Sequence, residues 1–214
     1  LASLDQSLKR MGLEYVDIFY HHRMDPNTPL EETMGALAQA VRSGKALYAG
    51  LSNYNGETLE KACAILDELH VPFVINQNRY SIFDRTIEQN GLKETAVRLN
   101  KGIIAFSPLA QGLLTNRYLN GIPEDSRMAK GAFLKKEALT DETLQKIKAL
   151  NEVAASRGQT LAEMSLAWLL KDDLVTSVII GASSVAQLAD NLKATENTDF
   201  SAEELEKIKK IIQK

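Results

Sequence analysis

Side chains capable of carbonyl chemistry stand directly after a short apolar run in the first tenth of the chain. His21 and His22 follow the aromatic and β-branched run 15–20. An imidazole at such a place could donate a hydrogen bond to a carbonyl oxygen and polarise it. Adjacent residues of a strand point to opposite faces, so only one of the two histidines can face a given cavity. A histidine satisfied by the neighbouring backbone is the alternative.

Side chains suited to a primary amide occur at the ends of two further apolar runs. Ser52 and Asn53 close the run 46–52, and Gln77 follows the run 71–76. A primary amide needs acceptors for its nitrogen and donors for its oxygen, and hydroxyl and amide side chains supply both. Serine and asparagine also cap ordinary turns, so the inference depends on the recurrence of these residues at successive run ends.

An aromatic ring and a hydroxyl end a fourth run, at residues 103–106. Phe106 could stack on a flat heterocycle, and a core phenylalanine before the turn at Ser107 and Pro108 is the alternative. The irregular stretch 109–139 follows, and such long loops are commonly functional. Arg117 and Arg127 lie in it and could add positive charge to bound phosphates, unless they are solvated surface residues.

The turn 180–184 joins an apolar run to a helical pattern. Backbone N–H groups and serine hydroxyls at the N-terminus of a helix form an anion site. Gln187 and Asn191 are four residues apart on the predicted helix, which places them on one face. The arrangement could hold a phosphate at the helix tip and a polar ring edge along its side. A capped helix with a solvated face is the alternative.

The apolar runs that precede these side chains alternate with amphipathic stretches. Strands are predicted at 15–20, 46–52, 71–76, 103–106 and 175–180. Helices are predicted at 2–11, 30–43, 56–69, 88–99, 141–156, 161–171, 184–193 and 202–212, the last beginning at a capping box of Ser201 and Glu204. This alternation predicts parallel strands, in an open doubly wound sheet or in part of a (β/α)8 barrel. Polar residues at the strand ends favour the barrel, whose active sites lie at that mouth.

Composition excludes several classes of function. The formal net charge of the 214 residues is -3, which gives no electrostatic basis for binding nucleic acid or an anionic membrane surface. No apolar run approaches the ~20 residues that span a bilayer. Cys63 is the one cysteine, so no internal disulfide can form and a reducing cytoplasm is expected. The three histidines and Cys63 lack the spacing of metal ligands, and we expect no metal site.

The stretches 10–18, 50–53, 106–112 and 180–183 follow one another in uninterrupted order. Together they resemble the aldo-keto reductase superfamily, and in particular its branch of potassium-channel β subunits and bacterial glyceraldehyde-phosphate or methylglyoxal reductases. The resemblance implies a (β/α)8 TIM barrel, of which residues 1–214 form a single domain covering roughly the last five strands and their helices. It also implies that the N-terminal strands are missing here, together with the aspartate, tyrosine and lysine that complete a catalytic tetrad.

The resemblance implies roles for individual residues. His22 matches the catalytic histidine. The cofactor-binding positions are Ser52, Asn53, Gln77, Phe106, Ser107, Leu109, Gln111, Gly112, Arg117, Arg127, Gly181, Ser183, Gln187, Asp190 and Asn191. Among them, Ser52, Asn53 and Gln77 match the residues that bind the nicotinamide carboxamide.

The expected activity is therefore NADP-dependent reduction of a small aldehyde or ketone by hydride transfer. No Lys or Arg stands between Gly181 and Gln187, so the preference for NADP over NAD depends on serine hydroxyls, Gln187 and helix-end amides. An NADP-binding, redox-sensing regulatory subunit without significant turnover is the alternative. A sugar-phosphate isomerase or aldolase on the same fold would not need the three amide-binding residues. The resemblance also suggests a homo-oligomer.

Overall fold

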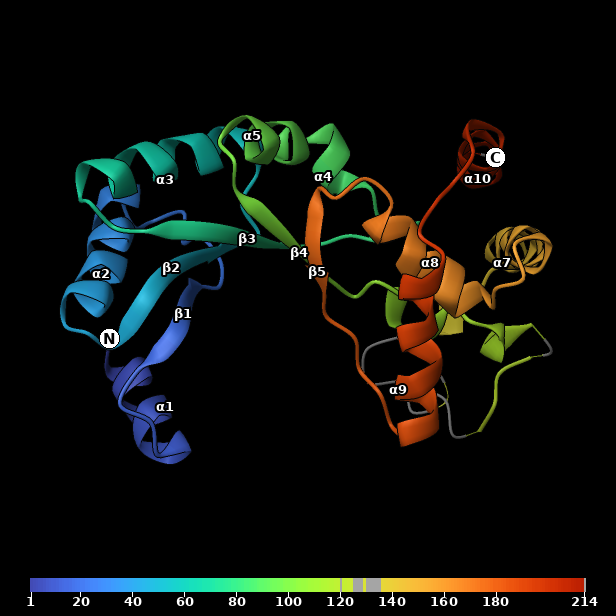
Figure 1. Cartoon of the computed structure of the whole chain (residues 1–214), viewed down its shortest axis with the longest axis horizontal. Coiled ribbons are helices and arrows are strands. Elements are labelled where there is room, and N and C mark those ends of the chain that lie inside the picture. The colour runs from blue at the N-terminus through green and yellow to red at the C-terminus, as the bar shows by residue number, and fades with distance from the viewer. Residues whose placement is uncertain (120, 125–128, 130–135, 214) are drawn as a thin grey trace. The chain divides into compact units, whose positions relative to one another are not determined.

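The computed structural model describes residues 1–119, 121–124, 129 and 136–213 (Figure 1). The chain forms two compact units. The first comprises Leu1–Arg79 and Thr86–Ile104, and the second comprises Tyr80–Arg85 and Ala105–Lys214. The single domain expected from the sequence for residues 1–214 stays a prediction.

The first unit alternates strands and helices along the chain. Its elements are α1 (Ala2–Met11), β1 (Val16–His21), α2 (Leu30–Arg42), β2 (Ala46–Ser52), α3 (Gly56–Glu68), β3 (Phe73–Arg79), α4 (Thr86–Gln89), α5 (Leu92–Arg98) and the first part of β4 (Gly102–Phe106). The strands follow one another in the order β1-β2-β3-β4-β5, and β1, β2 and β3 pair in parallel. Strands in sequence order with helical connections confirm the alternation predicted from the sequence.

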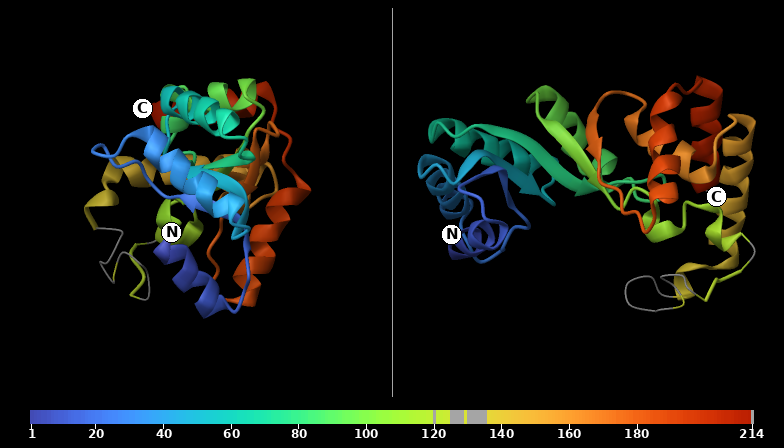
Figure 2. Two further views of the ribbon diagram at one scale, coloured as in Figure 1. Left: turned by 90° about the vertical axis from the view of Figure 1, so that its left-hand side faces the viewer. Right: turned by 60° about the horizontal axis from the view of Figure 1, so that its bottom comes forward.

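The two faces of β1 to β3 differ in their surroundings. Helix α2 packs against β1 and β2, and α3 packs against α2 and α5 (Figure 1; Figure 2, left). Ala49 and Leu51 point to this helical side and are fully buried. Tyr20 pairs with Gly50, and Gln77 pairs with Ser52. Gly50 and Ser52 are the two neighbours of Leu51 along β2, so Tyr20 and Gln77 belong to the opposite face. Polar side chains at the strand ends therefore lie on this opposite face.

Gly50 allows the strands to accommodate a large ring on that face. A Cβ atom at this position would lie 2.7 Å from two carbons of the Tyr20 ring and 2.8 Å from Cγ2 of Ile18. Such a distance is far inside van der Waals contact, so any other residue would displace the ring. The glycine therefore leaves the space that the Tyr20 ring occupies beside β2.

One predicted helix is wrong in its extent. Residues 88–99 do not form a single helix, because Gly91 adopts a left-handed φ of 75° and separates α4 from α5. The Asn90 side chain then accepts a hydrogen bond from the Leu92 N–H at 3.1 Å. Gly56 packs here as well, since a Cβ on it would lie 2.5 Å from the Gly91 carbonyl oxygen. Close backbone packing has broken the helix.

The second unit contains the end of β4, β5 and the C-terminal helices. Its remaining elements are η1 (Ala110–Gly112), η2 (Asn116–Tyr118), η3 (Lys136–Ala138), α7 (Asp141–Ser156), α8 (Leu161–Leu170), β5 (Val175–Val178), α9 (Val185–Leu192), η4 (Lys193–Glu196) and α10 (Ala202–Gln213). Helix α8 is the centre of this unit. It is apolar around most of its circumference and packs against α7, α9 and β5 (Figure 2, right).

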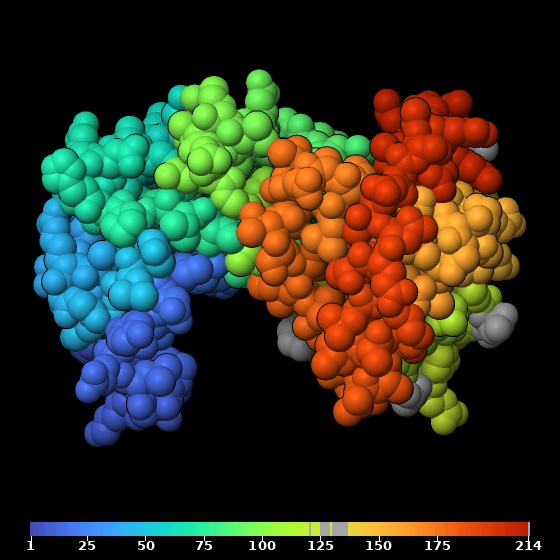
Figure 3. All heavy atoms as spheres, viewed as in Figure 1, coloured from blue at the N-terminus to red at the C-terminus, as the bar shows by residue number. Residues whose placement is uncertain are grey.

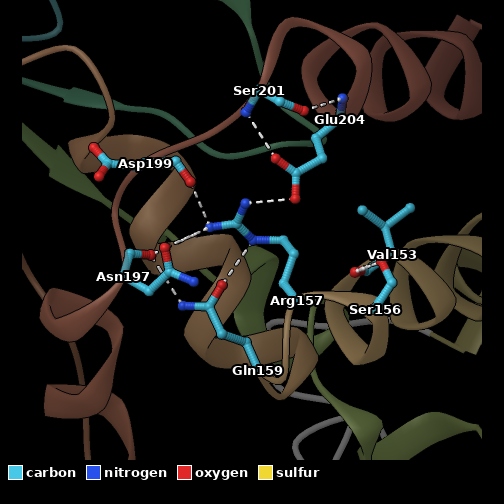
Figure 4. A network of polar contacts seen from close by, with 8 residues as sticks. All are labelled: Val153, Ser156, Arg157, Gln159, Asn197, Asp199, Ser201 and Glu204. Atoms are coloured by element: carbon cyan, nitrogen blue, oxygen red, sulfur yellow. Dashed lines mark hydrogen bonds and ion pairs between the residues drawn. The ribbon is translucent and has the colours of Figure 1, made fainter.

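A buried arginine joins the C-terminal segment to the end of α7 (Figure 4). The Arg157 side chain is 3% exposed and donates to Oε1 of Glu204 at 2.8 Å and to the carbonyl oxygen of Asp199 at 2.8 Å. Its guanidinium carbon also lies 3.6 Å from the centre of the Phe200 ring. Ser201 and Glu204 form the predicted capping box, with bonds of 2.7 and 3.2 Å. Glu204 therefore accepts hydrogen bonds both from the capping residue Ser201 and from Arg157.

Helix α9 lies at the surface of its unit. Its atoms are visible in Figure 3, and its large exposed apolar side chains are Val185, Leu188 and Leu192. Within the described part of the chain, the helices are too short or too polar to cross a membrane.

We predict that Arg157→Met lowers the free energy of unfolding by about 2 kcal/mol, because Glu204 and two backbone carbonyls lose their donor. Chemical denaturation measures this change. Lys61→Met is the matched control, since the Lys61–Glu57 pair is exposed and its loss should change stability little. Equal stability of the two variants would contradict the role of Arg157.

Candidate active site

Asn53 connects all the site residues that the sequence predicts in the first unit. Its φ of 61° is left-handed, a conformation that asparagine tolerates better than most residues. Its amide Nδ2 donates to the carbonyl oxygen of His22 at 2.9 Å and to Oγ of Ser52 at 3.1 Å. Its backbone N–H donates to the carbonyl oxygen of Gln77 at 3.0 Å. The ends of three adjacent strands are therefore tied to one residue.

The exposure of these residues fits a surface open to a ligand. Ser52 is 3% exposed, Asn53 and Gln77 are half-buried, and His22 is exposed. Gln77 also hydrogen-bonds Tyr20 on the same face. Burial raises the pKa of Tyr20, and the bond to Gln77 partly offsets this effect. Tyr20 is thus a neutral phenol at neutral pH, and its hydroxyl lies beside the Gln77 amide.

His21 is directed away from this face. Its Nδ1 lies 2.9 Å from the hydroxyl oxygen of Tyr54, and the two rings meet edge to face with centroids 6.0 Å apart. Burial, and then the charge of the neighbouring His22, lower the pKa of His21. Burial raises the pKa of Tyr54 to about 12. At neutral pH both groups are uncharged, which suits a hydrogen bond that is partly removed from water.

The carbonyl oxygen of Tyr54 is held as well. Asn78 Nδ2 donates to it at 3.0 Å, and Asn78 Oδ1 accepts from the amide of Asn76. Asn76 is fully buried, and among the described residues its Oδ1 has no hydrogen-bond partner. A polar layer therefore lies behind the strand ends, on the helical side of the sheet.

In the second unit, the residues after β4 form a tight, unusual turn. Ser107, Ala110 and Gln111 all have left-handed φ values, of 53°, 46° and 60°, and Gly112 follows at 106°. Three backbone bonds close the turn: Ala110 N to Ser107 O at 3.0 Å, Gly112 N to Leu109 O at 2.8 Å, and Leu114 N to Leu109 O at 3.2 Å. Phe106, Ser107, Leu109, Gln111 and Gly112, all predicted cofactor contacts, thus share one compact segment. Such backbone strain clusters at ligand-binding sites.

The turn before α9 is organised by Gln187. Its Oε1 accepts from the N–H of Ser183 at 2.7 Å and from the Ser183 hydroxyl at 2.9 Å. Ser184 caps the helix by accepting the Gln187 N–H at 3.2 Å. The predicted anion site at this helix N-terminus is therefore held in a defined shape, and the exposed residues Gly181 and Ser183 lie in front of it.

The remaining predicted positions differ in their surroundings. Asp190 is exposed and forms an ion pair with Lys193 at 2.7 Å. Asn191 is 6% exposed, and its Nδ2 has no hydrogen-bond partner within the part of the chain that the structure describes. Arg117 is exposed on η2, and Arg127 lies outside the described residues. No group of three potential metal ligands occurs among the described positions.

The family model described as "Aldo/keto reductase family" matches residues 1–213, almost the whole chain. The chain belongs to the aldo/keto reductase family. The resemblance inferred from four short stretches is thereby confirmed over the full length of the chain.

Known reductases and channel subunits of this family are similar to the chain. L-glyceraldehyde 3-phosphate reductase of Escherichia coli (strain K12) is 55% identical over 212 residues, which are 97% of this chain and 61% of that protein. A probable voltage-gated potassium channel subunit beta of Oryza sativa is 34% identical, over 100% of this chain and 66% of that protein. The chain thus spans about three fifths of the length of the reductase.

A solved aldo-keto reductase supports the fold. The crystal structure of a thermostable family member in complex with the inhibitor epalrestat superposes with a TM-score of 0.75 at 31% identity, covering 98% of this chain and 65% of that one. The five strands alternating with helices are part of a (β/α)8 barrel, as predicted.

The sequence did not single out Tyr54 as part of the site. It follows Ser52 and Asn53 directly, but a tyrosine after a strand is common in a core. Only the contact with His21, 33 positions earlier, shows what it does. The pairing of His21 with the helical side also leaves His22 for the opposite face. Strand alternation alone left this choice open, and the family resemblance made it for His22.

We predict that acidification destabilises the protein partly through His21. Its folded pKa is lowered, so the unfolded chain takes up the proton first and stability is lost as pH falls below the usual value of 6.5. His21→Asn removes this titration. The wild type should therefore lose more of its free energy of unfolding than the variant between about pH 7.5 and about pH 5. Equal losses in urea titrations at both pH values would refute the assignment.

Proposed function

We propose that the intact protein is an NADP-dependent oxidoreductase that reduces aldehydes or ketones to alcohols. The observation that carries this proposal is the bonding of Asn53 to His22, Ser52 and Gln77 on one face of the strands, in a member of a reductase family. Side chains that can bond a primary amide, next to a histidine that can bond a carbonyl oxygen, suit a carbonyl substrate and a nicotinamide carboxamide.

The residues present fit a nicotinamide nucleotide. In the first unit, Ser52, Asn53 and Gln77 would bind the carboxamide. In the second, Phe106 would stack on the ring, and the turn 107–112 with Arg117 and Arg127 would bind the phosphates. Gly181, Ser183 and Gln187 would bind the 2′-phosphate and ribose, and Asp190 and Asn191 the adenine. The buried Nδ2 of Asn191, which has no partner among the described residues, is a donor that a purine acceptor would satisfy.

The protein's part in the reaction is orientation and electrostatics. The bound cofactor supplies the hydride. His22 would donate a hydrogen bond to the substrate carbonyl oxygen and stabilise the negative charge that develops there. The bond from Asn53 to the His22 carbonyl oxygen holds the main chain of the histidine in place, so its imidazole searches fewer orientations.

A small aldehyde is the substrate class that we favour. The bacterial relative of 55% identity is named for reduction of L-glyceraldehyde 3-phosphate, which is therefore the first substrate to test. We infer a cytoplasmic location, since the single cysteine is a free, buried thiol.

A redox-sensing subunit is the second candidate. It is supported by relatives named as potassium-channel β subunits, which are 34–35% identical to the chain. Such a subunit would bind NADPH and release it unchanged in the presence of aldehydes. Steady-state oxidation of NADPH separates the two functions.

We predict that His22→Ala lowers kcat by ~10–1000-fold, because the carbonyl loses a hydrogen-bond donor, while NADPH binding is retained. NADPH oxidation gives kcat, and fluorescence titration gives the Kd. His70→Asn is the control, because His70 is exposed at the end of α3 in a left-handed conformation that asparagine accepts. An unchanged kcat in His22→Ala would exclude His22 from catalysis.

We predict that Gln187→Leu weakens NADPH binding by ~10-fold, because Ser183 loses the acceptor that shapes its turn. NADH, which has no 2′-phosphate, should lose less affinity. Val185→Ala, which shortens a largely exposed side chain of the same helix outside the proposed contacts, serves as a control for general disturbance of α9. A parallel loss for NADPH and NADH would contradict the proposed 2′-phosphate site.

A further inference from the structure

The end of β1 is attached to the turn after β2 by two side-chain hydrogen bonds, one on each face of the strands. On the site face, Asn53 Nδ2 reaches back to the carbonyl oxygen of His22 at 2.9 Å. On the helical face, the second bond joins His21, which precedes His22, to Tyr54, which follows Asn53, with Nδ1 of His21 2.9 Å from the Tyr54 hydroxyl oxygen. Consecutive residues on both segments are therefore bonded, one pair on each face.

Tyr54 is a rigid anchor for the second of these bonds. It is fully buried, and its carbonyl oxygen accepts the Asn78 amide at 3.0 Å, while its hydroxyl meets His21. Its main chain is therefore bonded to β3, and its fully buried ring has little rotamer freedom left to lose when the hydroxyl bonds His21. The turn that contains Asn53 is thus bonded to β3 through Asn78 and to the end of β1 through His21.

We propose that His21 and Tyr54 are positioning residues, whose hydrogen bond fixes the end of β1 against the turn after β2 and so sets where His22 and Asn53 act. This inference rests on the proposed function of those two residues. Neither His21 nor Tyr54 touches the substrate in this account. Without their bond, the Asn53–His22 contact would be the one remaining side-chain bond between the two segments among the residues that the structure describes, and it lies on the exposed face.

The chemistry of the pair agrees with a fixed contact. Burial keeps the Tyr54 hydroxyl protonated, with a pKa of about 12, and lowers the pKa of His21. The phenol can therefore donate to an unprotonated Nδ1 throughout the neutral range. The edge-to-face contact of the two rings, at an interplanar angle of 76°, adds directional packing.

The test is a double-mutant cycle in the intact protein with Tyr54→Phe, His21→Leu and the double variant. Tyr54→Phe keeps the buried ring and removes only the hydroxyl, so it should fold even if His21→Leu does not. We expect each variant to lower kcat by ~10-fold with little change in the KM for glyceraldehyde 3-phosphate, because catalytic geometry is disturbed and binding is not. The double variant should be no worse than the worse single variant, because both remove the same bond.

Rescue distinguishes positioning from general stability. His21→Asn places a hydrogen-bonding group near the location of Nδ1 and should recover most of the lost kcat. The controls are Tyr15→Phe and His70→Asn, both exposed and outside the site, and they should leave kcat unchanged. Wild-type kcat in Tyr54→Phe and His21→Leu, additive losses in the double variant, or failure of His21→Asn to restore activity would each overturn the proposal.

Failure of the proposed function gives a different result. If the wild type neither binds NADPH nor turns over aldehydes, the reductase assignment is wrong. The contact is then judged by backbone amide chemical shifts in Tyr54→Phe. Shifts of the His22 and Asn53 amides relative to Tyr15→Phe would support the positioning role, and unchanged shifts at both would refute it.

Discussion

The left-handed backbone of Asn53 is the constraint on which the first unit's candidate site depends. At a φ of 61°, the chain turns after β2 so that the side-chain amide points back to β1 and the backbone N–H points to β3. A β-branched or bulky residue would resist this conformation, and a glycine would adopt it without supplying the amide. Asparagine satisfies both requirements, and the positions of His22, Ser52 and Gln77 follow from it.

The two sides of the strand ends have different tasks. The side with Tyr20, Gln77 and His22 is open or half-open and carries groups that can exchange a hydrogen bond with a ligand. The other side is packed under helices and contains His21, Tyr54 and Asn78, whose polar groups bond one another. Buried polar networks of this kind give a unique geometry at the cost of desolvation. The strict alternation of a strand lets adjacent residues such as His21 and His22 take these separate tasks.

Much of this arrangement could be predicted from the sequence. Helix α7 and strand β2 have the predicted bounds, because their apolar periodicity and flanking caps agree. The single helix over 88–99 was wrong, since the left-handed Gly91 reflects packing against Gly56, a contact between distant residues. Strand β3 extends to Arg79, beyond the predicted end at 76, because backbone pairing continues through Asn76 and Gln77. The roles of the polar residues after each strand came from the family resemblance. The bond between His21 and Tyr54 could be identified only from the structure, because the two residues are 33 positions apart in the sequence.

We propose that a hydride passes from a bound nicotinamide to a carbonyl carbon in the intact protein. The most direct measurement is a single-turnover reaction of glyceraldehyde 3-phosphate with each 4-deuterated diastereomer of NADPH, followed by mass spectrometry of the alcohol. We expect one diastereomer to transfer its deuterium to the former carbonyl carbon and the other to transfer none. NADPH that stays bound and unoxidised with both diastereomers, leaving the aldehyde unlabelled, would contradict it.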